Sequence, residues 1–208
     1  DMKKAFADGG SIAINDNITA DESKTAAADR VTVEAPTTLY LGAMYTVPGS
    51  LEASNNWAAL YVKKDLTINA SSKGGINCLD KTDASASYIG GPYVAHIQGE
   101  GITVTVNGGK YYGGGTIFNV EKGTLIVNDG FFQVAPDVDT KDYRYTLNCI
   151  DGNYKNGTAK IIVKGGTYVN FDPSNNGAEG SGTNFVADGY KVVSEPHGSD
   201  TWYKVVAE

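Results

Sequence analysis

The sequence predicts an all-β protein, namely a right-handed, single-stranded parallel β-helix (a solenoid) with a short N-terminal capping helix. Residues that suit strands and turns dominate, with 26 Gly and 13 Tyr among 208 residues. Apolar and polar residues alternate in short runs, as the inward face of a strand requires. These runs also recur in one register along the chain, which is typical of a solenoid.

The first predicted element is a helix over residues 2–8, the one segment with a good helical pattern. Gly9 and Gly10 follow it directly, where a helix stop is expected. Two helical turns could cover the open end of a β structure. We therefore expect residues 1–30 to form an N-terminal cap, which contains this helix and the first strand.

The strands that follow are predicted from a repeat. Residues 102–112, 123–133 and 159–169 align without gaps; residues 65–70 match their first half, and residues 31–34 match more weakly. Two apolar columns run through the alignment, two residues apart. They consist of Leu66, Val104, Leu125 and Ile161, and of Ile68, Val106, Val127 and Val163. Residues two apart on a strand share a face, so both columns are predicted to point into the core.

Three further columns follow in the same register. The first contains Asn69, Asn107 and Asn128, then Lys164. Stacked Asn side chains can hydrogen-bond to their equivalents in neighbouring coils, so we expect a structural ladder. The next two are a glycine column, which predicts a corner, and an aromatic column, which predicts more core. They contain Gly109, Gly130 and Gly166, and Tyr111, Phe132 and Tyr168.

Unequal spacing between the repeats predicts loops. Equivalent core positions at residues 68, 106, 127 and 163 are separated by 38, 21 and 36 residues. The shortest interval is the expected bare coil, and the longer ones are expected to carry loops in residues 71–92 and in 135–143 or 151–157. A β-sandwich also has many short strands, but it does not explain recurrence in one register. We expect one domain, with coils over residues 31–170 and a C-terminal capping segment over residues 171–208.

These features give the chain a family resemblance. The opening helix, the Gly-Gly-Thr-Tyr corner at residues 165–168 and the Asn ladder resemble pectate-lyase-like right-handed β-helix proteins, over roughly residues 2–170. Residues 184–194 and 202–206 resemble the C-terminal end of β-helix proteins from gut Bacteroidales and their phages, some of which are virion fibre or surface components. The resemblance implies an extracellular, cell-surface or virion location, and fibres of this kind are often homotrimers.

Composition argues against several partners. The formal net charge of −7 is opposite to the clustered Lys and Arg that nucleic acid requires, and it disfavours an anionic membrane surface. No apolar run approaches the ~18 residues of a membrane helix, so no membrane insertion is expected. Cys78 and Cys149 are expected to be unpaired and buried. His96 is expected in the core or at its edge, and His197 at the surface.

No catalytic residue is assigned. Polysaccharide hydrolysis needs two carboxylates that face each other across the substrate. The outward strand positions carry Thr67, Thr103, Thr105, Thr124, Ile126, Lys160 and Ile162. No acid recurs there, Asp129 has no evident partner in register, and Arg30 and Arg144 lie outside the repeated columns. The alternative, a carbohydrate-active lyase or hydrolase of the β-helix class, would require a groove where acids, or an acid and a Lys or Arg, converge.

A metal site is weakly indicated. Asp137, Asp139 and Asp142 are spaced similarly to the ligands of a calcium loop. The segment lacks the glycine and the closing glutamate of an EF-hand, so a solvated acidic turn is favoured over calcium. No cofactor is therefore expected.

Aromatic residues are the best candidates for a binding site. Seven are expected at outward or loop positions, namely Trp57, Tyr88, Tyr93, Tyr112, Phe131, Tyr143 and Tyr154. Exposed aromatic rings suit the apolar faces of sugars, and they also suit a protein interface; packing under loops is the alternative. The preferred interpretation is a non-catalytic structural or adhesive surface module that presents loops and aromatic residues to a glycan or protein partner. A third interpretation, after the adhesive module and the enzyme, is a spacer domain that binds nothing.

Overall fold

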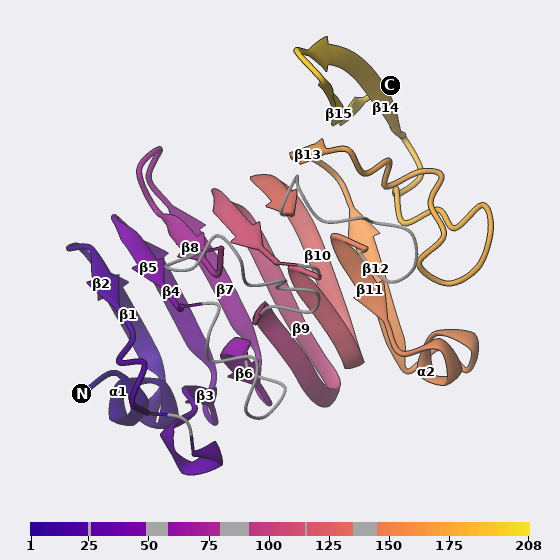
Figure 1. Ribbon diagram of the computed structural model, residues 1–208. Coiled ribbons are helices and arrows are strands. Elements are labelled where there is room, and N and C mark those ends of the chain that lie inside the picture. Colours follow the sequence, from indigo (N-terminus) through magenta and orange to yellow (C-terminus); the bar gives the residue numbers. More distant parts are fainter. Residues whose placement is uncertain (25, 49–57, 80–91, 115, 135–144) are drawn as a thin grey trace.

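The computed structural model describes residues 1–24, 26–48, 58–79, 92–114, 116–134 and 145–208. Over these residues the protein is all-β, with short helices at three places. Figure 1 shows the strands side by side in chain order, with the two termini at opposite ends of the molecule. The strands form three parallel ladders that share two long strands, β9 (Tyr93–Gly113) and β10 (Phe118–Val134).

The first ladder carries the predicted repeat. Besides β9 and β10 it contains β1 (Gly10–Ile14), β4 (Thr37–Leu41), β7 (Leu66–Ala70) and β12 (Ala159–Val163). The residues that pair in turn along one of its inward columns are Ile12, Leu39, Ile68, Val106, Val127 and Val163. All of them except Ile12 are fully buried. The predicted stacking of positions 68, 106, 127 and 163 on neighbouring strands is confirmed.

The other two ladders use shorter strands. The second contains β3 (Thr32–Val33), β6 (Ala58–Val62) and β11 (Leu147–Cys149), and the third contains β2 (Ile18–Thr19), β5 (Met44–Thr46), β8 (Gly75–Asn77) and β13 (Thr167–Val169). An antiparallel hairpin then extends the third ladder, because β13 pairs with β15 (Asp200–Ala207), and β15 pairs with β14 (Tyr190–His197). The segment from residue 171 onward, expected as a cap, contains this hairpin.

One predicted repeat is wrong. Residues 31–34 do not belong to the first ladder, because β3 pairs with β6 of the second ladder. The strands that continue the first ladder beyond β7 are β4 and β1, which the alignment missed. An apolar residue at every second position is common to the inward face of every strand. Four residues therefore do not tell one ladder from another.

The aromatic column lies in the core, as predicted. Tyr111, Phe132 and Tyr168 are fully buried and their rings stack, with centroids 5.3 and 4.8 Å apart. The two tyrosine hydroxyls donate hydrogen bonds to the carbonyls of Gly108 (2.6 Å) and Gly165 (3.1 Å). Each buried hydroxyl therefore has a hydrogen-bond partner. Burial raises the pKa of both hydroxyl groups.

The glycine column forms the predicted corner. Gly109 has φ 105°, Gly130 has φ 142° and Gly166 has φ 93°, and side chains rarely tolerate such angles. A Cβ atom at Gly130 would also lie 2.8 Å from the Cζ atom of Phe132. The corner therefore needs glycine both for its backbone angle and for the ring beside it.

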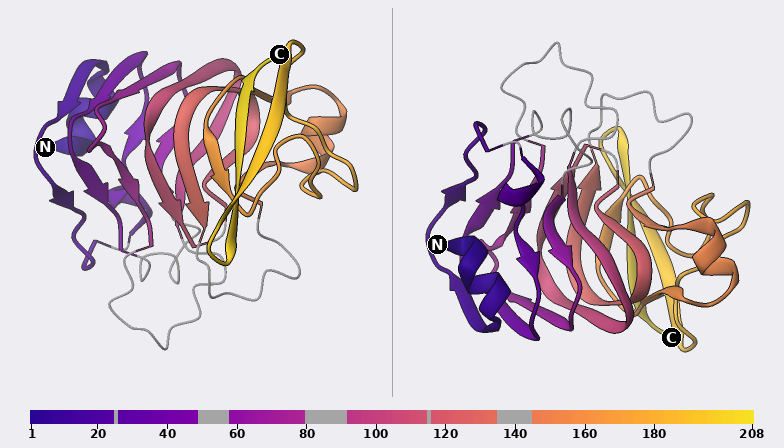
Figure 2. Two further views of the ribbon diagram at one scale, coloured as in Figure 1. Left: turned by 90° about the horizontal axis from the view of Figure 1, so that it is seen from above. Right: turned by 90° about the horizontal axis from the view of Figure 1, so that it is seen from below.

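The first helix agrees with the prediction and the others were missed. α1 (Met2–Asp8) is capped by Asp1 and Gly9 and buries Phe6, and Figure 2 places it at the N-terminal end of the strands. A 3₁₀ helix, η1 (Ala27–Asp29), follows β2. α2 (Asp151–Lys155) lies in residues 151–157, one of the two alternative segments expected to carry a loop. Five residues are too few to show a helical period. Cys78 and Cys149 are free and buried, as predicted.

Candidate functional site

The Asn column forms a ladder on the sheet surface. The Nδ2 atom of Asn107 donates to Oδ1 of Asn69 at 3.0 Å, and Nδ2 of Asn128 donates to Oδ1 of Asn107 at 2.9 Å. Each side-chain amide thus forms a hydrogen bond with the equivalent amide on the neighbouring strand. This arrangement supports the fold and leaves little of the amides for a ligand.

Two of the predicted aromatic residues lie together at the surface. Tyr112 and Phe131 have ring centroids 6.2 Å apart, and the ring of Trp202 lies 5.2 Å from that of Phe131. His197 stacks on Trp202 with centroids 3.6 Å apart. The first three rings are partly exposed and His197 is exposed. We call Tyr112, Phe131, Trp202 and His197 the aromatic row.

Strand alternation explains why the row faces outward. Tyr112 and Phe131 are sequence neighbours of Tyr111 and Phe132, which point into the core. Neighbouring residues on a strand point to opposite faces, so Tyr112 and Phe131 point away from it. Trp202 joins them because the antiparallel register of β13 and β15 places it on the same outer face. Sequence reasoning missed Trp202 and His197, which lie outside the repeat.

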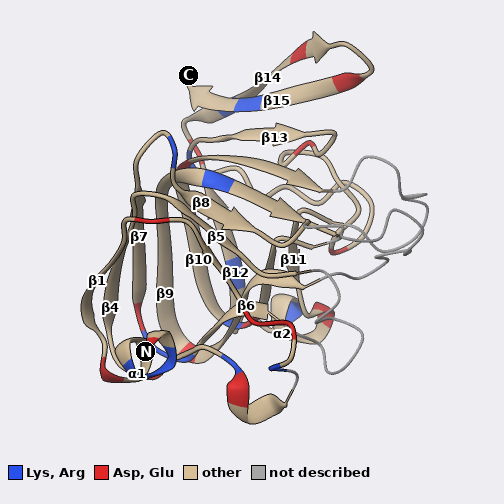
Figure 3. Ribbon diagram, turned by 60° about the vertical axis from the view of Figure 1, so that its left-hand side comes forward, with Lys and Arg blue, Asp and Glu red and all other residues tan. Residues whose placement is uncertain are grey.

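Polar groups flank the aromatic row. Glu195 forms an ion pair with Lys204, and its carboxylate lies 3.2 Å from Nε2 of His197, within hydrogen-bond distance. Hydrogen bonds from Lys204 and then His197 lower the pKa of the Glu195 carboxyl. Lys110 pairs in register with Phe131 and Gln133 pairs with Tyr112, so polar residues alternate with the two rings on β9 and β10. Figure 3 shows charges of both signs on the β14–β15 hairpin. The row is therefore an apolar stripe with hydrogen-bonding groups at its edges.

The other predicted residues are not part of this row. Tyr93 stacks on His96 in the second ladder (5.7 Å), and Tyr154 in α2 contacts Phe185 edge-on (6.2 Å). The remaining aromatic candidates and the calcium candidates lie outside the described residues. They are Trp57, Tyr88 and Tyr143, and Asp137, Asp139 and Asp142.

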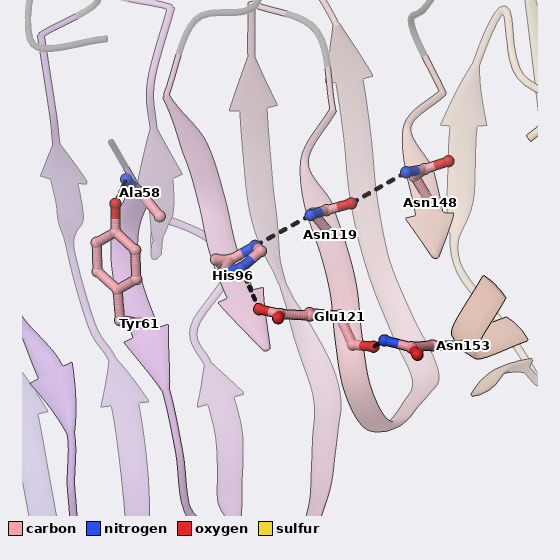
Figure 4. Close-up of polar contacts among 7 residues, drawn as sticks. All are labelled: Ala58, Tyr61, His96, Asn119, Glu121, Asn148 and Asn153. Carbon is pink, nitrogen blue, oxygen red and sulfur yellow. Dashed lines mark hydrogen bonds and ion pairs between the residues drawn. The ribbon is translucent and has the colours of Figure 1, made fainter. Parts of the chain in front are cut away.

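A row of polar side chains crosses the outer side of the second ladder (Figure 4). His96, Asn119 and Asn148 are successive register partners on β9, β10 and β11. Nδ2 of Asn119 lies 3.0 Å from Nδ1 of His96, and Nδ2 of Asn148 donates to Oδ1 of Asn119 at 3.0 Å. Nε2 of His96 lies 3.1 Å from a carboxylate oxygen of Glu121. We call His96, Asn119 and Asn148 the polar row.

The electrostatics of the polar row favour a neutral imidazole. Burial lowers the pKa of His96, and the hydrogen bond and charge of Glu121 oppose that shift in part. His96 is half-buried at the edge of the core, as predicted. A neutral His96 with its proton on Nε2 donates to Glu121 and accepts from Asn119.

A pocket of about 400 Å³ lies at the end of the polar row. It is lined by Tyr93, Thr116, Tyr145, Asn148, Asp151, Gly177, Ala178 and Gly180, and we call it the Asp151 pocket. Beside it, Glu179 accepts a hydrogen bond from the backbone amide of Cys149 at 2.6 Å. Burial raises the pKa of Glu179 to about 7; the Cys149 amide opposes this shift, Asp151 adds to it, and Lys155 lowers it slightly.

No protein-family model, curated protein or solved structure matches the chain. Within the described residues, no three His, Cys, Asp or Glu side chains converge as a metal site would require. No helix in that part of the chain is long and apolar enough to cross a membrane. The candidate sites therefore rest on their own geometry.

Proposed function

We propose that the chain is a right-handed parallel β-helix that acts as a non-catalytic adhesive surface module and binds a glycan through the aromatic row. The β-helix is supported by the three ladders, since β9 and β10 each contribute to all of them. Each turn of such a chain would add one strand to every ladder. Side chains of one kind would then lie in rows across the strands, as those of the polar row do.

The aromatic row is the observation that carries the function. Its rings come from β9, β10, β15 and β14, so the row crosses the strands and is one ring wide. Aromatic side chains that are half exposed combine a large apolar face with polar edges. An extended chain of sugars presents apolar ring faces and a rim of hydroxyl groups. Lys110, Gln133 and Glu195 beside the row could hydrogen-bond to such hydroxyls.

A glycan fits this surface better than a protein partner does. Protein interfaces have a wide buried core of anchors surrounded by a polar rim. Here the aromatic row is one ring wide, Lys110 and Gln133 are register partners of two of its rings, and Glu195 and Lys204 form an ion pair on the hairpin that carries the other two. A narrow stripe with a close polar border matches a linear polysaccharide.

The location and assembly of the module form part of the same proposal. We infer from the family resemblance that the module acts outside the cell, on a bacterial surface or in a phage fibre. A homotrimer would present three aromatic rows to one glycan surface and increase avidity. Light scattering of the purified chain would test this assembly, and a monomer would contradict it.

A glycan array probed with the purified chain tests the function. We expect binding to at least one polysaccharide, and we expect Trp202→Ala to weaken it roughly ten-fold or more, because Trp202 links the two halves of the row. Tyr40→Ala is the matched control, since Tyr40 is an exposed aromatic residue on the first ladder. Failure to bind any glycan, or equal losses in the two variants, would reject the proposal.

One observation favours the alternative, a carbohydrate-active lyase or hydrolase. Asp151 and Glu179 are two interacting carboxyl groups next to a pocket, and the pKa of Glu179 is raised to about 7. Raised carboxyl pKa values are common among catalytic acids. Assays for new reducing ends and for unsaturated products, run on every glycan that binds, would decide. Cleavage that Asp151→Asn abolishes would establish the enzyme.

A further inference from the structure

We propose that the Asp151 pocket binds a primary ammonium group, carried either by an amino sugar or by a lysine side chain. The pocket lies on the second ladder, whereas the aromatic row lies on the third. This second site therefore does not depend on the function proposed for the aromatic row. Its support comes from two hydrogen-bond acceptors and two aromatic residues that line one space, and from a second carboxyl group that interacts with one of those acceptors.

The polar row orients an acceptor towards the pocket. Because the Glu121 carboxylate only accepts hydrogen bonds, the single proton of the neutral His96 imidazole lies on Nε2, and Nδ1 is an acceptor. Asn119 therefore donates to Nδ1, and its Oδ1 accepts from Asn148. Figure 4 shows the amide oxygen of Asn148 on the side away from Asn119. Glu121 thus sets the direction of the whole row, which ends in a carbonyl oxygen at the pocket.

The side chains that line the pocket suit an ammonium ion. Asp151 supplies a carboxylate from the first turn of α2, and Asn148 supplies its amide oxygen. Tyr93 and Tyr145 supply aromatic walls, and Tyr93 is held in place by its stacking on His96. An ammonium group donates three hydrogen bonds and is attracted to aromatic faces. A charged acceptor, a neutral acceptor and two rings meet both requirements.

A second carboxyl group strengthens the preference for a cation. Glu179 lies beside the pocket, and its carboxyl group interacts with that of Asp151, which lines it. The charged groups that act on Glu179 are Asp151 and Lys155, and the nearby Cys149 thiol stays neutral because burial raises its pKa. A bound ammonium group would relieve the repulsion between the two carboxylates.

An organic cation fits better than a metal ion. The described residues bring no three metal-binding side chains together, and tyrosine rings are not ligands for hard cations. The volume of about 400 Å³ is also far larger than an ion needs and falls in the range of small-molecule pockets. The pocket could therefore hold the amine together with the sugar ring or alkyl chain that carries it.

Titration of the isotope-labelled chain with four probes tests the inference by NMR. The probes are glucosamine, N-acetylglucosamine, Nα-acetyl-lysine methylamide and the same compound acetylated at Nε. We expect the free amines to shift the side-chain amide signals of Asn148. Their acetylated forms should bind at least about ten-fold more weakly. The free amine that binds more tightly identifies a glycan or a protein as the source. Binding of neither free amine, or equal binding of the acetylated forms, would overturn the inference.

A variant pair localises the effect. Asp151→Asn should weaken binding of the free amine about ten-fold or more, whereas Asp16→Asn should not, although both remove one negative charge. Trp202→Ala should leave amine binding unchanged, which separates this site from the aromatic row. Affinity for the lysine probe should rise between about pH 6 and pH 8 as Glu179 loses its proton. Equal effects of the two aspartate variants would overturn the inference. If Asp151→Asn did not fold, the contrast between free and acetylated amines would still decide.

Discussion

At the scale of single residues, the contribution of a ladder side chain to stability depends on how many hydrogen bonds it forms with its equivalents on neighbouring strands. Asn107 donates to Asn69 and accepts from Asn128, so it takes part in both hydrogen bonds of the Asn ladder. Asn128 takes part in one of them. The amides are exposed or half-exposed, so water can replace part of what each bond contributes.

We predict that Asn107→Ala lowers the free energy of unfolding by about 1–2 kcal/mol, because two hydrogen bonds are lost. Asn128→Ala is the matched control and should cost roughly half as much. Urea unfolding of both variants, followed by circular dichroism, measures the difference. Equal losses would mean that the ladder bonds contribute little to stability.

At the scale of one strand, β10 separates stability from binding at two adjacent positions. Phe132 is fully buried and stacks between Tyr111 and Tyr168. Phe131 points to the other face, where it lies in the aromatic row between Tyr112 and Trp202. The alternation of a strand thus assigns neighbouring phenylalanines to the core and to the candidate site.

Alanine at these two positions should have opposite consequences. Phe132→Ala is expected to destabilise the protein by about 3–5 kcal/mol, because it leaves a cavity in the aromatic stack. Phe131→Ala should cost roughly 1 kcal/mol or less in stability and should still weaken glycan binding. Thermal unfolding and the glycan array measure the two effects. A large loss of stability in Phe131→Ala would show that Phe131 is a packing residue.

At the scale of the whole molecule, the pH dependence of stability has a contribution from Glu179. Its pKa is raised from 4.5 to about 7 in the folded protein, chiefly by burial. Between these two pH values, Glu179 is therefore protonated in the folded protein and ionised in the unfolded chain. The stabilisation is fully present below pH 4.5 and is lost as the pH rises towards about 7.

We predict that Glu179→Gln stabilises the protein by roughly 1 kcal/mol at pH 8 and has little effect at pH 4, a modest value because Glu179 is partly exposed to solvent. The Gln carbonyl can still accept the hydrogen bond from the Cys149 amide. Urea unfolding at both pH values measures the difference. The same gain at both pH values would show that ionisation of Glu179 does not contribute to stability.

The sequence by itself determined the all-β class, the inward columns, the glycine corner and the terminal helix. These are local properties, because a period of two residues and a glycine with positive φ are set within one strand and its turn. Where the local pattern was too short, the assignment of residues 31–34 to the repeat was wrong and the five-residue helix α2 was missed. Only the tertiary structure decided which side chains meet across distant segments. Trp202 joins Phe131 through the antiparallel hairpin, and Glu179 joins Asp151 through a segment outside the repeat, and no repeated register connects either pair.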